Sequence, residues 1–245
     1  MYSQNRFPKL MIPTDPRYPQ TADNLREIAE RAGEAAAKYR SSDETVQIMA
    51  VTKTVEPDKI NFAVECGITL LGENRVQEFM SKKDSYDKRA EVQFIGHLQT
   101  NKVKYIINDV TMIQSVDSLK LANEINRLAA KNGRVMDVLL EVNIGGEESK
   151  SGVDRGALFE LAEQAAALEN IRLRGLMAIP PIGCGEEVFA QMRELYEALA
   201  AKKLPNTDIS VLSMGMSGDY EMAIKHGSTL VRIGTGLFGA RDYSR

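Results

Sequence analysis

The chain has 245 residues, of which 43% are hydrophobic and 27% are charged, which is enough to bury one large core or two small ones. A formal net charge of -3 argues against nucleic acid or an anionic membrane as the main partner and favours small-molecule ligands. The two cysteines and two histidines show no disulfide or zinc-ligand spacing, and no apolar run approaches the length of a membrane span. Because no signal peptide is recognisable, we expect a cytoplasmic protein with free thiols at Cys66 and Cys184.

The first twenty residues contain four prolines, Pro8, Pro13, Pro16 and Pro19. Proline lacks a backbone N–H and interrupts regular structure, so residues 1–20 are predicted to form an irregular arm. Apolar residues then recur at helical spacing as far as Tyr39, behind Thr21 and Asp23, which are residue types that cap helices. One amphipathic helix is therefore expected before the first strand.

Eight short runs rich in Val, Ile, Leu and Met follow this helix. They cover residues 46–53, 68–72, 92–98, 111–116, 135–143, 171–179, 209–215 and 229–235. Most are continuously apolar, which is typical of parallel strands buried on both faces. Helices are predicted between them at residues 57–66, 74–83, 101–107, 118–131, 156–168, 187–202 and 219–226.

This alternation predicts an α/β fold in which residues 21–245 form a single (β/α)8 barrel of the TIM type with one additional N-terminal helix. A doubly wound open sheet is the alternative. That fold normally carries a glycine fingerprint after its first strand, and residues 51–57 contain no glycine.

The predicted barrel gathers the chemically active residues at one end. Active sites of this architecture lie where strands end and helices begin, and the last two βα loops often hold phosphate. Lys53 ends the first strand, and the glycine-bearing turns at 213–219 and 231–239 are of the kind that cradles a phosphate group. Further candidates at the same end are Asn74, His97, Asn143, Met177, Ser217 and Arg232. A lysine with a phosphate cradle suggests a covalently held phosphorylated aldehyde.

A series of short motifs runs in order through the chain. They read AVTK at 50–53, GENRVQE at 72–78, FIGHLQTNK at 94–102, VNI at 142–144, SKSG at 149–152, GLM at 175–177, SMGMS at 213–217 and VRIGT at 231–235. In these motifs, from about Asp23 to Tyr243, the chain resembles the pyridoxal phosphate homeostasis protein family, whose members are alanine-racemase-like barrels.

This resemblance implies a barrel that carries pyridoxal 5'-phosphate as a Schiff base on Lys53. The implied role is intracellular vitamin B6 homeostasis and cofactor supply, with pyridoxal phosphate-dependent apo-enzymes as recipients and without a robust catalytic turnover of its own. An imine forms from an unprotonated amine, so partial burial or nearby positive charge should lower the pKa of Lys53. We expect a monomer, because no interface stripe is visible in the sequence.

The resemblance also implies roles for the other cofactor-binding candidates. Arg232 should face the pyridine nitrogen and keep it unprotonated, which makes the ring a weak electron sink. Ser217, Gly234 and Thr235 should hold the phosphate, although Ser217 also fits a helix cap. Asn74 should lie near the lysine and the ring, but with Gln77 three residues on it equally fits a capping box, and capping alone is the simpler interpretation.

Two further residues receive no cofactor role. His97 is interpreted as an ordinary loop histidine. Lys150, in the loop after the fifth strand, is either an auxiliary amine that attracts the anionic vitamin or a solvated lysine at the rim, and we favour the rim.

Two enzymatic alternatives share this chemistry. An amino-acid racemase of the related type needs a second base, usually from an added β-rich domain, and only a few residues follow the eighth predicted strand. A Schiff-base aldolase would use a barrel lysine and a sugar-phosphate cradle, but such lysines more often lie on later strands. The residues alone leave the three functions open, and the resemblance favours the non-catalytic carrier.

Overall fold

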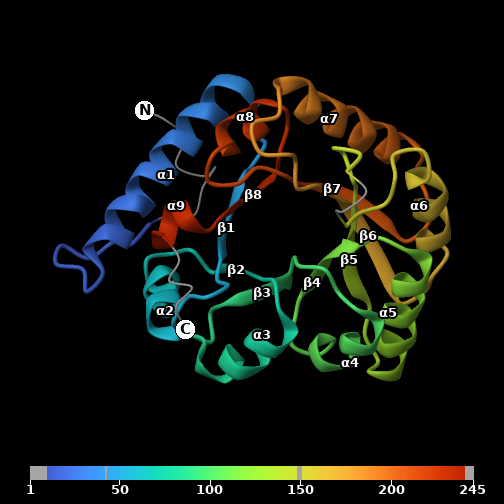
Figure 1. The fold of residues 1–245 in the computed structure, drawn as a ribbon, viewed down its shortest axis with the longest axis horizontal. Coiled ribbons are helices and arrows are strands. Elements are labelled where there is room, and N and C mark those ends of the chain that lie inside the picture. Colours follow the sequence, from blue (N-terminus) through green and yellow to red (C-terminus); the bar gives the residue numbers. More distant parts are fainter. Residues whose placement is uncertain (1–9, 42, 148–150, 241–245) are drawn as a thin grey trace.

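The computed structural model describes residues 10–41, 43–147 and 151–240. Its eight strands are parallel and close into a barrel in chain order, from β1 beside β2 round to β8 beside β1. Figure 1 shows the helices arranged around the outside of the strands, with helix α1 preceding β1. The predicted (β/α)8 barrel with an additional N-terminal helix is therefore confirmed.

The strands are short, and each overlaps one of the predicted apolar runs. They are β1 Gln47–Val51, β2 Leu70–Glu73, β3 Glu91–Phe94, β4 Met112–Val116, β5 Met136–Glu141, β6 Ile171–Met177, β7 Thr207–Ser213 and β8 Leu230–Ile233. The helices are α1 Pro19–Tyr39, α2 Pro57–Glu65, α3 Val76–Lys82, α4 Val103–Ile106, α5 Leu119–Lys131, α6 Leu158–Ala166, α7 Glu186–Ala201, α8 Tyr220–Lys225 and α9 Thr235–Phe238. Two short 3-10 segments, η1 Lys83–Ser85 and η2 Thr100–Lys102, complete the described elements.

The start of α1 differs from the sequence prediction. The helix begins at Pro19, inside the stretch expected to be irregular, and Thr21 is buried in its first turn. The prediction that Thr21 and Asp23 cap this helix is therefore wrong. Proline suits the first helical position, because the N–H it lacks would have no partner within the helix.

Apolar side chains fill the barrel interior away from the carboxyl ends of the strands. Alternation along β1 turns Ile48 outward to the helices and Met49 inward, where Met49 packs in a cluster with Leu70 and Leu230. Gly72 makes room for this cluster, since a Cβ atom there would lie 2.5 Å from the Met49 sulfur. Because packed side chains fill this part of the barrel, polar residues are left to the end where the strands finish and the helices begin.

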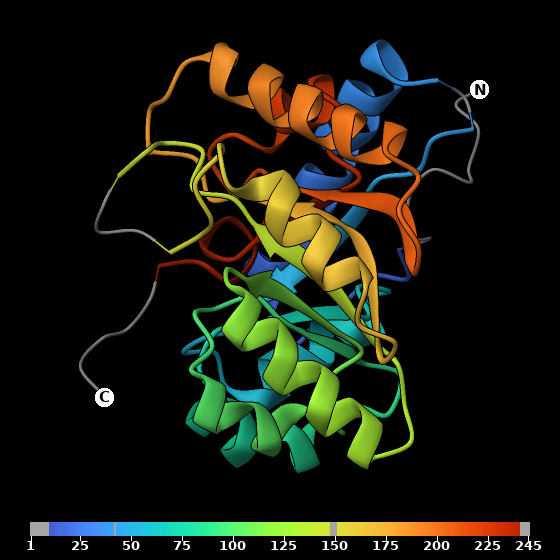
Figure 2. The same cartoon turned by 90° about the vertical axis from the view of Figure 1, so that its right-hand side faces the viewer.

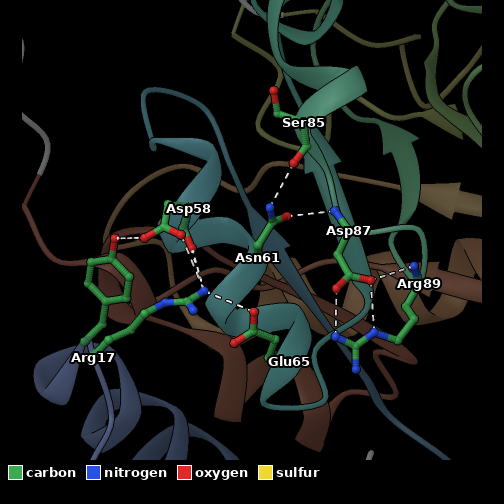
Figure 3. A network of polar contacts seen from close by, with 8 residues as sticks. Arg17, Asp58, Asn61, Glu65, Ser85, Asp87 and Arg89 are labelled. Atoms are coloured by element: carbon green, nitrogen blue, oxygen red, sulfur yellow. Dashed lines mark hydrogen bonds and ion pairs between the residues drawn. The ribbon is translucent and has the colours of Figure 1, made fainter.

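The segment before α1 is attached to α2. Leu10 and Ile12 pack against the main core, and the backbone N–H of Met11 donates to the carbonyl of Cys66 at 2.9 Å. Figure 3 shows Arg17 reaching across to α2, where its guanidinium donates to Glu65 Oε1 at 3.1 Å. Residues 10–18 thus belong to the packed structure although they form no helix or strand.

The same helix face holds the connection from α3 to β3. The Asn61 side chain donates to the carbonyl of Ser85 at 2.8 Å and accepts from the backbone N–H of Asp87 at 2.8 Å (Figure 3). Asp87 in turn forms a double hydrogen bond with Arg89.

Among the described residues, no helix is long and apolar enough to cross a membrane.

Candidate functional site at the barrel mouth

The predicted site residues lie at the carboxyl ends of the strands. Lys53 is half-buried two residues after β1, and Asn74 follows β2 directly. Ser217 lies in the loop after β7, while Gly234 and Thr235 follow β8. Figure 2 shows the loops after β5 and β6 and the red α9 on the same side of the barrel, on the left of the view. Because all strands are parallel, these segments form one mouth.

The backbone before Lys53 is fixed through Thr52, whose side chain is fully buried. Its hydroxyl donates to Glu73 Oε1 at 2.6 Å, and its N–H donates to the carbonyl of Gly72 at 3.1 Å. Tyr86 also donates to Glu73 Oε1. Burial raises the pKa of Glu73, although the bonds from Thr52 and Tyr86 oppose this. A buried carboxyl on β2 thus holds the end of β1.

The backbone after Lys53 is fixed by a second glutamate. Thr54 has φ of +62°, a left-handed conformation that a β-branched residue rarely adopts. Its N–H donates to Glu78 Oε1 at 2.5 Å, and Lys82 donates both to this carboxylate and to the carbonyl of Thr52, at 3.1 Å. Burial acts to raise the pKa of Glu78, but the hydrogen bonds from Lys82 and Thr54 outweigh it and lower the pKa. The backbone on both sides of Lys53 is held in place.

Arg232 lies at 3% exposure inside the barrel, beneath the mouth, and begins a row of polar side chains. Its Nη1 donates to Ser213 Oγ at 2.6 Å, and its Nη2 donates to the carbonyl of Ala178 at 2.7 Å. The Ser213 hydroxyl donates to Gln114 at 2.7 Å, and Gln114 donates to Gln93 at 2.6 Å. Burial lowers the pKa of Arg232 to about 10, so the guanidinium stays charged near neutral pH. A positive charge is thereby fixed beneath the mouth.

Glu141 is a mouth residue that the sequence reasoning missed. It ends β5 with 5% exposure, and burial raises its pKa to about 7, with the nearby Asp117 carboxylate adding to the rise and Arg232 opposing it. A carboxyl residue directly after the apolar residues Val138, Leu139 and Leu140 was the available signal. Near neutral pH this carboxyl can gain or release a proton.

The two glycine-bearing turns meet as predicted. The Ser217 hydroxyl accepts a hydrogen bond from the N–H of Gly236 at 3.0 Å and lies 3.5 Å from the Thr235 hydroxyl. The N-cap position of α8 is Asp219, which accepts from the N–H of Met216 at 2.6 Å. The interpretation of Ser217 as the cap of α8 is therefore wrong, because its oxygen serves the first turn of α9. Hydroxyls and backbone N–H groups gathered in this way suit an anion.

The capping interpretation of Asn74 is also wrong. The N-cap of α3 is Arg75, which makes no side-chain capping bond. Within the described ranges the buried Oδ1 of Asn74 has no hydrogen-bond partner, and its backbone packs on Gly96, where a Cβ atom would lie 2.1 Å from the Asn74 carbonyl oxygen. A buried acceptor of this kind is costly unless a donor reaches it.

Among the described residues, the remaining candidates form no hydrogen bond with this group. His97 Nδ1 lies 3.4 Å from Ser151 Oγ and 3.7 Å from Asp117 Oδ2, with the side chain 60% exposed. Asn143 donates to the carbonyl of Glu147 at 2.8 Å and so supports its own loop, while Met177 packs inside the barrel. The prediction for Lys150 lies outside the described residues. In the described part of the chain no His, Cys, Asp or Glu cluster could hold a metal ion.

A family model for the N-terminal domain of alanine racemase matches residues 21–242. The chain belongs to this family. Within it, the chain is 44% identical to the pyridoxal phosphate homeostasis protein of Aquifex aeolicus (strain VF5), covering 90% of this chain and 98% of that protein. It is 38% identical to the protein of the same name from Escherichia coli (strain K12), covering 91% and 98% respectively.

Solved structures of several similar proteins have the same fold. A protein of unknown function from Bifidobacterium adolescentis matches with a TM-score of 0.86 and 35% identity, over 94% of this chain and 99% of that one. PipY of Synechococcus elongatus PCC7942, in a structure with pyridoxal phosphate bound, matches with a TM-score of 0.75 and 33% identity, over 86% of this chain and 100% of that one. Alanine racemase from Corynebacterium glutamicum shares the fold at 16% identity and a TM-score of 0.68, over 91% of this chain and 61% of that one.

Proposed function

We propose that this protein binds pyridoxal 5'-phosphate at the barrel mouth as a Schiff base on Lys53, and that it takes part in vitamin B6 homeostasis and cofactor supply. The observation that carries the proposal is the meeting of Ser217 with Thr235 and Gly236 at the end of the barrel where Lys53 is held between two fixed residues. The pyridoxal phosphate found in PipY supports it.

The residues present fit this cofactor. The hydroxyls of Ser217 and Thr235, with the backbone N–H of Thr235 that follows Gly234, would hold the phosphate. The buried Oδ1 of Asn74 is an acceptor that a donor on the cofactor would satisfy. Lys53 supplies the amine. Bound there, the cofactor supplies an aldehyde that combines reversibly with amines and a ring that can accept electrons.

Arg232 favours holding the cofactor over chemistry on it. Its pKa of about 10 keeps it protonated near neutral pH, and two of its five N–H groups already bind Ser213 and Ala178. A fixed cation beside the ring nitrogen disfavours protonation of that nitrogen, which weakens the ring as an electron sink. This environment therefore suits binding and later release of the cofactor rather than catalysis on it.

The experiment is a visible absorption spectrum of the protein incubated with pyridoxal 5'-phosphate and then freed of unbound ligand. The wild type and a Lys120→Ala control, altered at an exposed lysine on α5, should retain a coloured adduct, and Lys53→Ala should not. The loaded wild type should then activate an apo-enzyme while showing no sustained racemisation of alanine. Equal retention by Lys53→Ala, or steady racemisation of alanine by the loaded wild type, would contradict the proposal.

A further inference from the structure

A polar pocket lies at the opposite end of the barrel from Lys53. It encloses about 250 Å³ between the end of α1, the middle of α7 and the end of α8, which lie side by side in Figure 1. Its walls include Tyr39, Arg40, Glu44, Arg193, Lys225 and His226. The segments after α1 and α8 lead into the starts of β1 and β8, so the pocket belongs to the amino-terminal end of the barrel.

Arg40 is the most deeply buried charge in this pocket, with its side chain 4% exposed. Its Nη2 donates to Glu44 Oε1 at 2.9 Å. Its Nε and Nη1 are also buried, and neither reaches an acceptor in the part of the chain that the structure describes. Leaving guanidinium donors buried without acceptors costs free energy that a bound acceptor would recover.

Arg193 stands in a fixed position beside Arg40. Its Nε donates to Glu197 Oε1 at 2.6 Å, and its guanidinium lies over the Tyr196 ring at 5.7 Å. Gly227 gives it space: a Cβ atom there would lie 2.4 Å from Arg193 Nη1, and the φ of +88° also favours glycine. The side chain is thus held by contacts on three sides.

The charges that line the pocket are mainly positive. Arg40, Arg193 and Lys225 contribute cations, and Glu44 is the carboxylate among the lining residues. Glu186 pairs with Lys225 and His226 without lining the pocket. Two guanidinium groups in one pocket, of which Arg40 has donors without acceptors among the described residues, match the oxygens of a phosphate, which arginine binds through parallel hydrogen bonds.

We propose that this pocket is a second, oxyanion-binding site, which takes inorganic phosphate or the phosphate group of a small ester. A small rotation of the Arg40 side chain would bring its buried Nε and Nη1 to the anion, and Arg193 and Lys225 would add positive charge around it. The enclosed volume admits a phosphate with a small organic part and is below the ~300 Å³ at which pockets for drug-sized ligands begin. The site is separate from the mouth and does not depend on cofactor binding there.

The test is a calorimetric titration with inorganic phosphate and, separately, with glycerol phosphate. Both are added to protein loaded with pyridoxal 5'-phosphate and to a Ser217→Ala variant, so that phosphate binding at the mouth is recognised by its loss in that variant. Arg193→Gln and Gly227→Ala should each weaken binding about tenfold, the effect of one charged hydrogen bond. Arg127→Gln, which breaks an exposed ion pair on α5, should leave it unchanged.

Arg40→Gln should abolish binding, and because Arg40 is buried its fold is checked by circular dichroism, while the Arg193 and Gly227 variants stand as an independent test. Tighter binding of the ester would identify a phosphorylated small molecule, and tighter binding of the free ion would identify phosphate itself. Absence of binding to the wild type, or equal binding by wild type, Arg193→Gln and Gly227→Ala, would overturn the proposal.

Discussion

Lys53 owes its position to its neighbours. Thr52 is anchored to Glu73, and Thr54 is anchored to Glu78 in a left-handed conformation. A backbone fixed on both sides limits the places that the lysine amine can reach, which lowers the entropy lost when the amine forms a bond. This makes Glu78 a positioning residue.

Replacing Glu78 with glutamine should weaken cofactor retention, because the amide cannot form the ion pair with Lys82 that holds the carboxylate beside Thr54. Loss of one charged hydrogen bond predicts about a tenfold fall in affinity. The pH at which the colour of the bound cofactor changes should also shift. A defect that only destabilised the fold would not move this pH. Titration by absorbance measures both, with Glu124→Gln, from an exposed pair, as the control. An unchanged affinity and colour transition would show that Glu78 does not position Lys53.

Glu141 should make stability fall with rising pH. Its pKa is raised from 4.5 to about 7, so between these values the folded protein keeps a proton that the unfolded chain has released. The stability present below this window is therefore lost across it, by up to about 3 kcal/mol. Glutamine does not titrate, so Glu141→Gln should lack this fall.

The measurement is urea unfolding of wild type and Glu141→Gln from about pH 4.5 to about pH 8. The difference between the two free energies of unfolding should change through the window in favour of the variant at high pH. Parallel curves would mean that Glu141 titrates in its ordinary range.

At the scale of elements, the row from Arg232 through Ser213 and Gln114 to Gln93 joins β8, β7, β4 and β3 across the inside of the barrel. Each side chain is the hydrogen-bond partner of the next, so losing one leaves its neighbours with unpaired polar atoms. It places a positive charge under the mouth while its other end stays neutral.

Removing the centre of this row should be costly. Ser213→Ala leaves the Arg232 Nη1 and the Gln114 Oε1 without their shared partner, and the expected loss is about 1–3 kcal/mol in the free energy of unfolding. Ser210→Ala, on the exposed part of the same strand, should change it by less than about 0.5 kcal/mol. Chemical denaturation compares the two, and equal losses would contradict a special role for the row.

The order of elements and the end of the barrel that carries the site were predictable, because apolar runs and helix periodicity are local signals. The polar row and the role of Glu78 were not, since Gln93 and Gln114 bond to each other between separate strands and Glu78 bonds to Thr54, which lies 24 residues away in the chain. Helix α9 was missed because one turn is too short to show a period. Capping remained an alternative interpretation for Asn74 and Ser217 because capping residues and ligand-binding residues share the same side-chain types.

At the scale of the whole molecule, residues 10–18 pack against α2 and the main core, although their prolines predicted an irregular arm. Tyr18 packs on Phe62 with ring centroids 5.5 Å apart and donates to Asp58 on α2. The division into an arm of residues 1–20 and a barrel of residues 21–245 stays a prediction. Because Tyr18 contacts α2, we expect the arm to contribute to the stability of the barrel.

Tyr18→Ala should therefore lower the free energy of unfolding by about 2–3 kcal/mol, through lost ring packing and the lost bond to Asp58. Tyr105→Ala removes a tyrosine that is 50% exposed on α4 and should cost less than about 1 kcal/mol. Thermal and urea unfolding provide the comparison. Equal effects would mean that the arm contributes nothing to the stability of the barrel.

The attachment of pyridoxal 5'-phosphate to Lys53 is tested most directly by borohydride reduction of the loaded protein followed by mass spectrometry of its peptides. Reduction makes the bond between lysine and cofactor permanent, so the modified residue can be located. We expect the added mass on the peptide that contains Lys53 and on no other. An adduct at another lysine, or loss of the cofactor on denaturation despite reduction, would contradict the assignment.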